Sequence, residues 1–310
     1  MAWGCMVSRH LGLLASAAAL AIAGSGTAHA VPDYAYAELS FTNFTLSGVV
    51  DANGNPVVGI TFTSTPSVTS TDSATYPGAP AGGNSAGGTL AAGTNPDEAI
   101  SGPGPFPGQN VFTQTLTPAS TLSPAGTRAD ALTTGSLASG STSNLVAEGK
   151  LSTSGNAGAS SSTSTTLNVS VSQNTSLSLT FNASATLQDA LAVTSGDSAS
   201  AQTSTTFQIF NATIGQFITI TDNINAANSG TLIAPFALND SLVAPGSFSP
   251  PPSAYSYSAT LLAGDNYQIT FQDSTSLTLQ SVQSVPEPVS IGLLGSGLVI
   301  FGLTRLRNRS

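Results

Sequence analysis

The stretch LNVSVSQNTSLSLTF, from Leu167 to Phe181, gives the clearest indication of the fold class of this chain. Apolar residues occupy every second position in its two halves, and Ser, Asn or Thr stand between them. Successive side chains of a β-strand point to opposite faces, so this period of two indicates strands that each bury one face. The stretch therefore predicts β structure rather than helix.

The same alternation recurs along much of the chain. It is found in residues 58–62, 207–209, 214–220, 255–261, 267–271 and 277–279. Helix formers such as Lys, Glu, Arg and Met are scarce, whereas Ser, Thr, Asn and Gly are abundant. We therefore predict an all-β protein with a single antiparallel β-sandwich over residues 31–284. Gly264–Asp265–Asn266 lies between two of the runs and predicts a hairpin turn.

One long stretch interrupts the alternation. Residues 76–109 contain 9 Gly and 6 Pro, a composition that predicts a long surface loop. The loop could mark a domain boundary near residue 105. We favour one domain with a long excursion, because the sequences on both sides have similar compositions.

The first thirty residues have the order of a secretory signal peptide. Arg9 precedes an apolar run over residues 11–23, and Ala28 and Ala30 place small residues at a cleavage site after Ala30. A helix of this run rises about 20 Å, less than the roughly 30 Å hydrocarbon core of a bilayer. We expect residues 1–30 to form a signal helix that is removed on export.

Cys, His, Met and Trp occur only within those thirty residues. The exported body therefore lacks the side chains for disulfides, zinc-finger or haem ligation, Cys nucleophiles and His general bases. Arg128 and Lys150 are its only bases, and the whole chain has a formal net charge of −9. This balance argues against nucleic acid and anionic membrane surfaces as partners. Divalent cations and sugars are more compatible partners for an acidic body with few charges.

The C-terminus has three consecutive parts. Pro286, Glu287 and Pro288 come first, an uncharged apolar segment follows at 289–304, and Arg305, Arg307 and Arg309 end the chain. Cations after an apolar segment obey the positive-inside rule and predict a transmembrane helix over 289–304. The helix is near the short limit for a span, which flanking Arg side chains can accommodate.

This tail, residues 285–310, resembles the PEP-CTERM sorting signal of Gram-negative bacteria, the substrate of exosortase-type transpeptidases. The resemblance implies that Pro286, Glu287 and Pro288 are recognised by such a processing enzyme. It also implies an intermediate anchored in the inner membrane by the C-terminal helix. The processed protein would then reach the cell surface or the extracellular space.

Two local features of the body have competing interpretations. Asp51, Asn53 and Asn55 place oxygen ligands at alternate positions, as in the first half of a calcium loop. Asn53–Gly54 also predicts a type I′ turn, which we favour because the later calcium ligands are missing. Calcium remains the only metal that this composition suits. Lys150 is expected to be a surface cation.

Three functions remain open. We expect a structural or adhesive protein of the cell surface or extracellular matrix that requires no cofactor, because the tail resembles a sorting signal. The alternative is a carbohydrate-binding or calcium-dependent lectin-like module with extracellular polysaccharide as its partner. A third hypothesis is a glycan-active enzyme that uses carboxylates alone, although we expect no enzymatic activity.

Overall fold

The two halves of the Leu167–Phe181 stretch are strands whose buried residues alternate with partly exposed ones, as the sequence predicts. A computed structural model describes residues 33–88, 98–116, 125–136, 140–191, 196–222, 231–233, 236–243 and 245–282. These residues form β-strands and no helix. The predicted all-β class is therefore confirmed.

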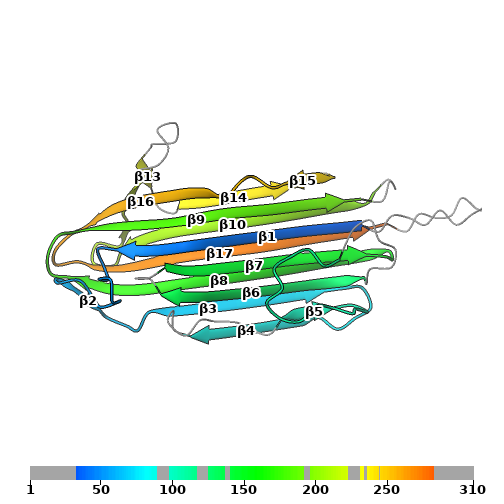
Figure 1. Cartoon of the computed structure of the whole chain (residues 1–310), viewed down its shortest axis with the longest axis horizontal. Helices are drawn as coiled ribbons and strands as arrows, with labels where there is room; N and C mark the ends of the chain where they lie inside the picture. Colours follow the sequence, from blue (N-terminus) through cyan, green and yellow to red (C-terminus); the bar gives the residue numbers. More distant parts are fainter. Residues whose placement is uncertain are drawn as a thin grey trace, which may run out of the picture.

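Two antiparallel sheets contain all the strands of the described residues (Figure 1). In order across nine-stranded sheet A lie β13 (Thr231–Ile233), β12 (Thr219–Asp222), β16 (Ser253–Leu261), β9 (Thr175–Ala190), β1 (Asp33–Ser47), β7 (Gly140–Leu151), β6 (Gly126–Ser136) and β5 (Ala99–Ser101), with β15 (Gly246–Phe248) on β9. Across eight-stranded sheet B lie β11 (Gln216–Phe217), β10 (Ser198–Asn211), β17 (Asn266–Ser281), β8 (Gly155–Val171), β3 (Ser67–Thr75) and β4 (Gly82–Gly88), with β14 (Phe236–Leu242) on β10 and β2 (Ile60–Phe62) on β8.

From β7 onward, the long strands alternate between the two sheets. The chain passes from β7 in sheet A to β8 in sheet B, then to β9 in A and β10 in B. The turn at Gly264–Asp265–Asn266 likewise joins β16 of sheet A to β17 of sheet B, so the predicted hairpin is wrong. Strands β8, β9, β10 and β17 bury alternate residues on one face, and these connections place the buried faces of successive strands opposite each other across the core.

The core between the sheets contains large side chains in one half and small ones in the other. Phe41, Phe44, Phe181 and Phe271 contact one another, with ring centroids 4.6–6.2 Å apart. A second cluster consists mainly of alanines from both sheets, together with Leu151, Leu277 and Leu279. The sandwich is thus held together by apolar burial along its length.

The predicted loop over residues 76–109 is wrong for two stretches, because β4 and β5 lie within it. β4 has the sequence GGNSAGG and pairs with β3 through its backbone, which requires no large side chain. The chain after β5, residues 102–116, is irregular and is called the 102–116 loop below.

The predicted signal peptide, residues 1–30, and the sorting tail, residues 285–310, lie outside the described residues. In the part of the chain that is described, no helix has the length and apolarity to cross a membrane. Asp33 pairs with Leu151, Ser281 pairs with Gly155, and the β7–β8 turn joins these two partners. Both ends of the described chain therefore lie at the same end of the sandwich (Figure 1).

Candidate functional site

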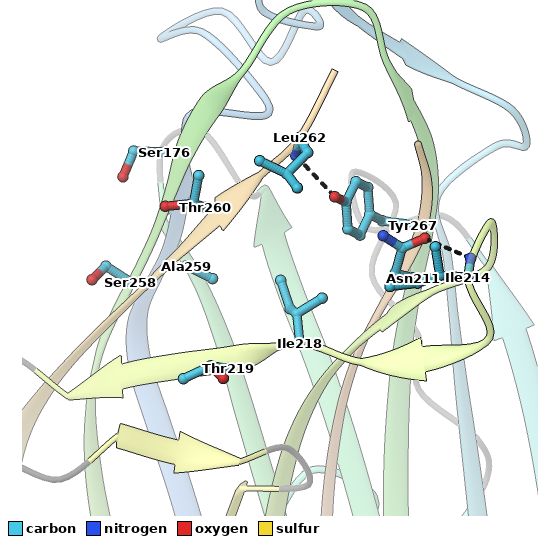
Figure 2. Close-up of a pocket in the computed structure, with 10 residues that line it drawn as sticks. All are labelled: Ser176, Asn211, Ile214, Ile218, Thr219, Ser258, Ala259, Thr260, Leu262 and Tyr267. Atoms are coloured by element: carbon cyan, nitrogen blue, oxygen red, sulfur yellow. Dashed lines mark hydrogen bonds between the residues drawn. The ribbon is translucent and has the colours of Figure 1, made fainter. Parts of the chain in front are cut away.

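A pocket of about 430 Å³ opens at the other end of the sandwich, where the two sheets separate (Figure 2). It lies between β16, the start of β9, the β10–β11 turn and the segment that leads into β12. Ile214, Ile218 and Leu262 supply aliphatic surface, whereas Thr219 and Thr260 lie at the border of the pocket with their side chains directed away from Ile218 and Leu262 (Figure 2). The pocket is therefore assembled from segments that are far apart in the sequence.

A hydrogen-bond network beside the pocket fixes its shape. The hydroxyl of Tyr267 accepts a hydrogen bond from the Leu262 backbone N–H at 2.8 Å and donates one to the Asp265 carboxylate at 3.3 Å. Asn211 Nδ2 donates to the same carboxylate at 2.8 Å, and Asn211 Oδ1 accepts from the Ile214 N–H at 3.3 Å. Burial raises the pKa of the Tyr267 hydroxyl. The network joins the turns on two sides of the pocket.

Aliphatic and aromatic side chains near the pocket are unusually exposed. Ile214 is 59% exposed, Leu262 is 51% exposed, and Phe217 is also exposed. Single exposed apolar residues are common on protein surfaces. Their grouping at one pocket is more informative, because clustered apolar surface marks sites of binding.

A second polar cluster lies on the outer face of sheet A beneath the 102–116 loop. Arg128 of β6 and Glu148 of β7 are register partners, and both are fully buried. Arg128 Nε donates to Glu148 at 2.9 Å, and its two terminal nitrogens donate to the carbonyl oxygens of Val111 and Thr113 at 2.6 and 2.8 Å. Arg128 thus connects the loop to the sheet.

Glu148 holds the same loop from the acceptor side. Its carboxylate accepts hydrogen bonds from the backbone N–H groups of Thr115 and Leu116 at 2.8 and 2.6 Å. The Thr115 hydroxyl and the Tyr34 hydroxyl also donate to it, at 2.6 and 3.0 Å. Burial is the main cause of a raised pKa at Tyr34. Arg128 and Glu148 thus hold the 102–116 loop against sheet A, and we call this pair the clamp.

Glycine is required at one point beneath the same loop. Gly126, at the start of β6, has a φ of +150° and lies directly under the ring of Phe106 from the loop. A Cβ atom at this position would collide with that ring. The absence of a side chain at Gly126 therefore allows the loop to approach the sheet closely.

Several carboxyl groups lie inside the sandwich. Asp72 of β3 and Asp189 of β9 are 1% and 3% exposed. Within the described chain the Asp189 carboxyl has no hydrogen-bond partner, whereas the Ser161 hydroxyl lies close enough to Asp72 to oppose the rise of its pKa. Burial raises the pKa of both carboxyls to about 7. Asp273 accepts hydrogen bonds from Ser143 and Thr163, and burial raises its pKa to about 6. Burial therefore shifts the protonation equilibrium of these groups toward the neutral form in the folded protein.

The outer face of sheet B is uncharged along β3, β8, β17 and β10, and we call it the hydroxyl face. Its partly exposed positions are Ser, Thr, Asn or Gln, with Gly155, Gly158 and Phe210 as exceptions. A shallow groove of about 260 Å³ at its centre is bordered by Ser162, Ser164, Ser204, Thr206, Gln272 and Ser274. Polar side chains here repeat about every 7 Å along a strand and about 5 Å between strands.

The calcium candidates Asp51, Asn53 and Asn55 form a compact turn. Asp51 Oδ1 accepts the backbone N–H groups of Asn53 and Asn55 at 2.8 and 2.9 Å, and these hydrogen bonds lower the pKa of Asp51. The Gly54 N–H donates to the Asp51 carbonyl, so Ala52 and Asn53 are the two central residues of the turn. Of the four turn residues, only Gly54 has a positive φ. The predicted turn is present, but type I′ is wrong because that type requires a positive φ at Asn53.

No group of three or more His, Cys, Asp or Glu side chains that could hold a metal ion is present in the described part of the chain. Calcium binding at Asp51 therefore remains a prediction. Lys150, expected at the surface, is instead only 2% exposed, and burial lowers its pKa. That expectation was wrong because the sequence did not reveal how completely this part of sheet A is covered.

The predicted sorting residues Pro286, Glu287, Pro288, Arg305, Arg307 and Arg309 and the cleavage residues Ala28 and Ala30 lie outside the described residues. The pocket and the clamp were not predicted. The opposite charges of Arg128 and Glu148 would have indicated the clamp only if β6 and β7 had been recognised as a hairpin. Nothing in the sequence indicated the pocket, because its walls come from separate segments.

The fold and its sites define an all-β protein of two packed antiparallel sheets, with a pocket at one end and an uncharged outer face. No protein-family model matches the chain, and no curated protein is similar to it in sequence.

Proposed function

We propose that this chain is an exported protein of the cell surface or extracellular matrix with a structural or adhesive role. An exosortase-type enzyme would process its tail, after an intermediate stage in the inner membrane. The observation that best supports the proposal is the position of the chain ends. Asp33 and Val282 lie at one end of the sandwich, so an anchor in the 285–310 tail would be attached at the end opposite the pocket.

Removal of the tail is the first prediction. In the native host, we expect the surface form of the protein to end before the 289–304 segment and to lack the C-terminal Arg residues. The measurement is the intact mass of the purified surface protein from strains with and without the exosortase-type enzyme. Replacing Glu287 by Ala should cause the full-length form to accumulate in the membrane fraction. Proteins ending at Ser310 in both strains would contradict sorting.

A second candidate function is binding to a neutral extracellular polysaccharide, and the hydroxyl face supports it. An uncharged array of hydroxyls and amides can exchange hydrogen bonds with sugar hydroxyls without desolvating a charge. Neighbouring side chains of the array already interact across the strands. Ser73 and Ser160 are 2.8 Å apart, as are Ser200 and Thr278.

Introducing charge into the central groove tests this candidate. We expect Gln272→Glu combined with Ser274→Glu to reduce retention on microcrystalline cellulose about tenfold, because the added carboxylates would have to lose water on contact. The matched control is Thr180→Glu combined with Asn182→Glu in β9, on the outer face of sheet A, which should retain the wild-type level. Equal retention of both double variants would exclude the hydroxyl face as the contact surface.

A further inference from the structure

The edge of sheet B at β4 has no partner strand in the described part of the chain (Figure 1). β4 pairs with β3 over its whole length without a register shift, and it ends the strand order of the sheet. An edge strand presents a row of backbone N–H and C=O groups that a further strand can pair with. This edge is therefore a surface on which the sheet can be extended.

The backbone groups that point outward belong to alternate residues of β4. The Ser85 N–H donates to Oδ1 of its neighbour Asn84 at 2.8 Å, so it is directed away from the ladder with β3. Alternate residues of an antiparallel strand share the direction of their N–H and C=O groups, so Gly83 and Gly87 also face outward. All three residues are exposed. An incoming strand can replace the local contact between Ser85 and Asn84.

The β4 edge lacks the usual protection against pairing with another chain. Natural edge strands are protected by charged residues, proline, a bulge or short length. β4 has seven residues with the sequence GGNSAGG, and none of these devices. Among the other edge strands of the described chain, β2, β5, β13 and β15 have three residues each, β11 has two, and β14 contains Asp240.

The sequence of β4 favours an identical strand as the partner. It is nearly symmetrical about Ser85, so two antiparallel copies centred on this residue bring small uncharged residues opposite each other. The facing residues are Gly82 and Gly88, Gly83 and Gly87, and Asn84 and Ala86. This pairing is isologous, so it closes as a dimer. The outward groups of Gly83, Ser85 and Gly87 would form about six backbone hydrogen bonds across it.

We propose that two copies of this chain associate through β4, which joins their B sheets into one. The twofold axis of antiparallel pairing is perpendicular to the sheet, so both copies keep their hydroxyl faces on the same side. Ser85 and its register partner Thr71 lie on that side, and the two hydroxyl faces become continuous. This self-association goes beyond the proposed function and rests on neither tail processing nor sugar binding.

The test is sedimentation velocity of the full chain in a mild detergent over a wide range of protein concentration. We expect the wild type to change from monomer to dimer at roughly 100 µM, because one strand pair buries less than the ~1,200 Å² of a stable interface. Ser85→Lys and Ser85→Glu should each weaken this association about tenfold, because two like charges then meet at its centre. An equimolar mixture of the two variants should associate at least as well as the wild type, since opposite charges then face each other.

The matched control is Ser276→Lys, which places the same charge on the outer face of sheet B but on the central strand β17. It should associate as the wild type does. The proposal is overturned if the wild type stays monomeric throughout, if either charged variant of Ser85 dimerises as readily as the wild type, if the mixture stays monomeric, or if the control loses as much association. Thermal unfolding of each variant establishes that the fold is intact. Tail processing is measured separately in the native host, so failure of the sorting proposal is distinguishable from failure of this one.

Discussion

Replacing Arg128 by Met is expected to lower the free energy of unfolding by about 3–5 kcal/mol, the range found when one partner of a buried ion pair is removed. The substitution leaves Glu148 buried without its cation. It also leaves the carbonyl oxygens of Val111 and Thr113 without their donor. For a body of this size the loss corresponds to a fall in Tm of roughly 10 °C. Differential scanning calorimetry of the purified protein measures it.

The clamp also predicts where the variant first becomes mobile. Release of the 102–116 loop should expose Phe106 and Phe112 to chymotrypsin, with cleavage much faster than in the wild type. Arg128→Lys keeps the charge but cannot reproduce the forked contacts, so it should show an intermediate loss. Combining Arg128→Met with Glu148→Gln should recover part of the stability, because the uncompensated charge is then removed. An unchanged Tm in Arg128→Met would show that the clamp contributes nothing.

The buried carboxyls predict an unusual dependence of stability on pH. The pKa values of Asp72 and Asp189 rise from 3.8 to about 7. Between about pH 4 and pH 7 the folded protein therefore keeps protons that the unfolded chain releases. Stability should fall as the pH rises through this window, by at most about 4 kcal/mol per carboxyl for a shift of three pKa units. Asp273, with a pKa of about 6, should add a smaller loss in the same direction.

Neutral replacements separate this effect from general alkaline destabilisation. Asp189→Asn and Asp72→Asn should each unfold at a higher urea concentration than the wild type at pH 8, while the difference disappears near pH 4. Asp51→Asn is the matched control, because the Asp51 carboxylate is exposed and its pKa is lowered rather than raised. It should leave the loss of stability at high pH unchanged. Wild-type stability that is constant from pH 4 to pH 8 would contradict the prediction.

The alternating pattern of Leu167–Phe181 and its relatives correctly predicted strands with one buried face. The Gly/Pro-rich composition of residues 76–109 predicted a loop, whereas part of this stretch forms strand β4 through backbone pairing. The glycines of β4 lack the side chains on which the alternation rule depends, yet their N–H and C=O groups complete a ladder with β3.

The fold class and the two faces of the alternating strands are predictable from the amino-acid sequence, because both depend on neighbouring residues. Strand pairing is not predictable in this way, since the same alternation suits a hairpin and a connection between sheets. The turn at Gly264 illustrates this difference. The burial of Arg128, Asp72 and Lys150 likewise depends on which strands and loops pack together. The end pocket also depends on the folded structure, because side chains far apart in the sequence meet only when strand pairing and register are set.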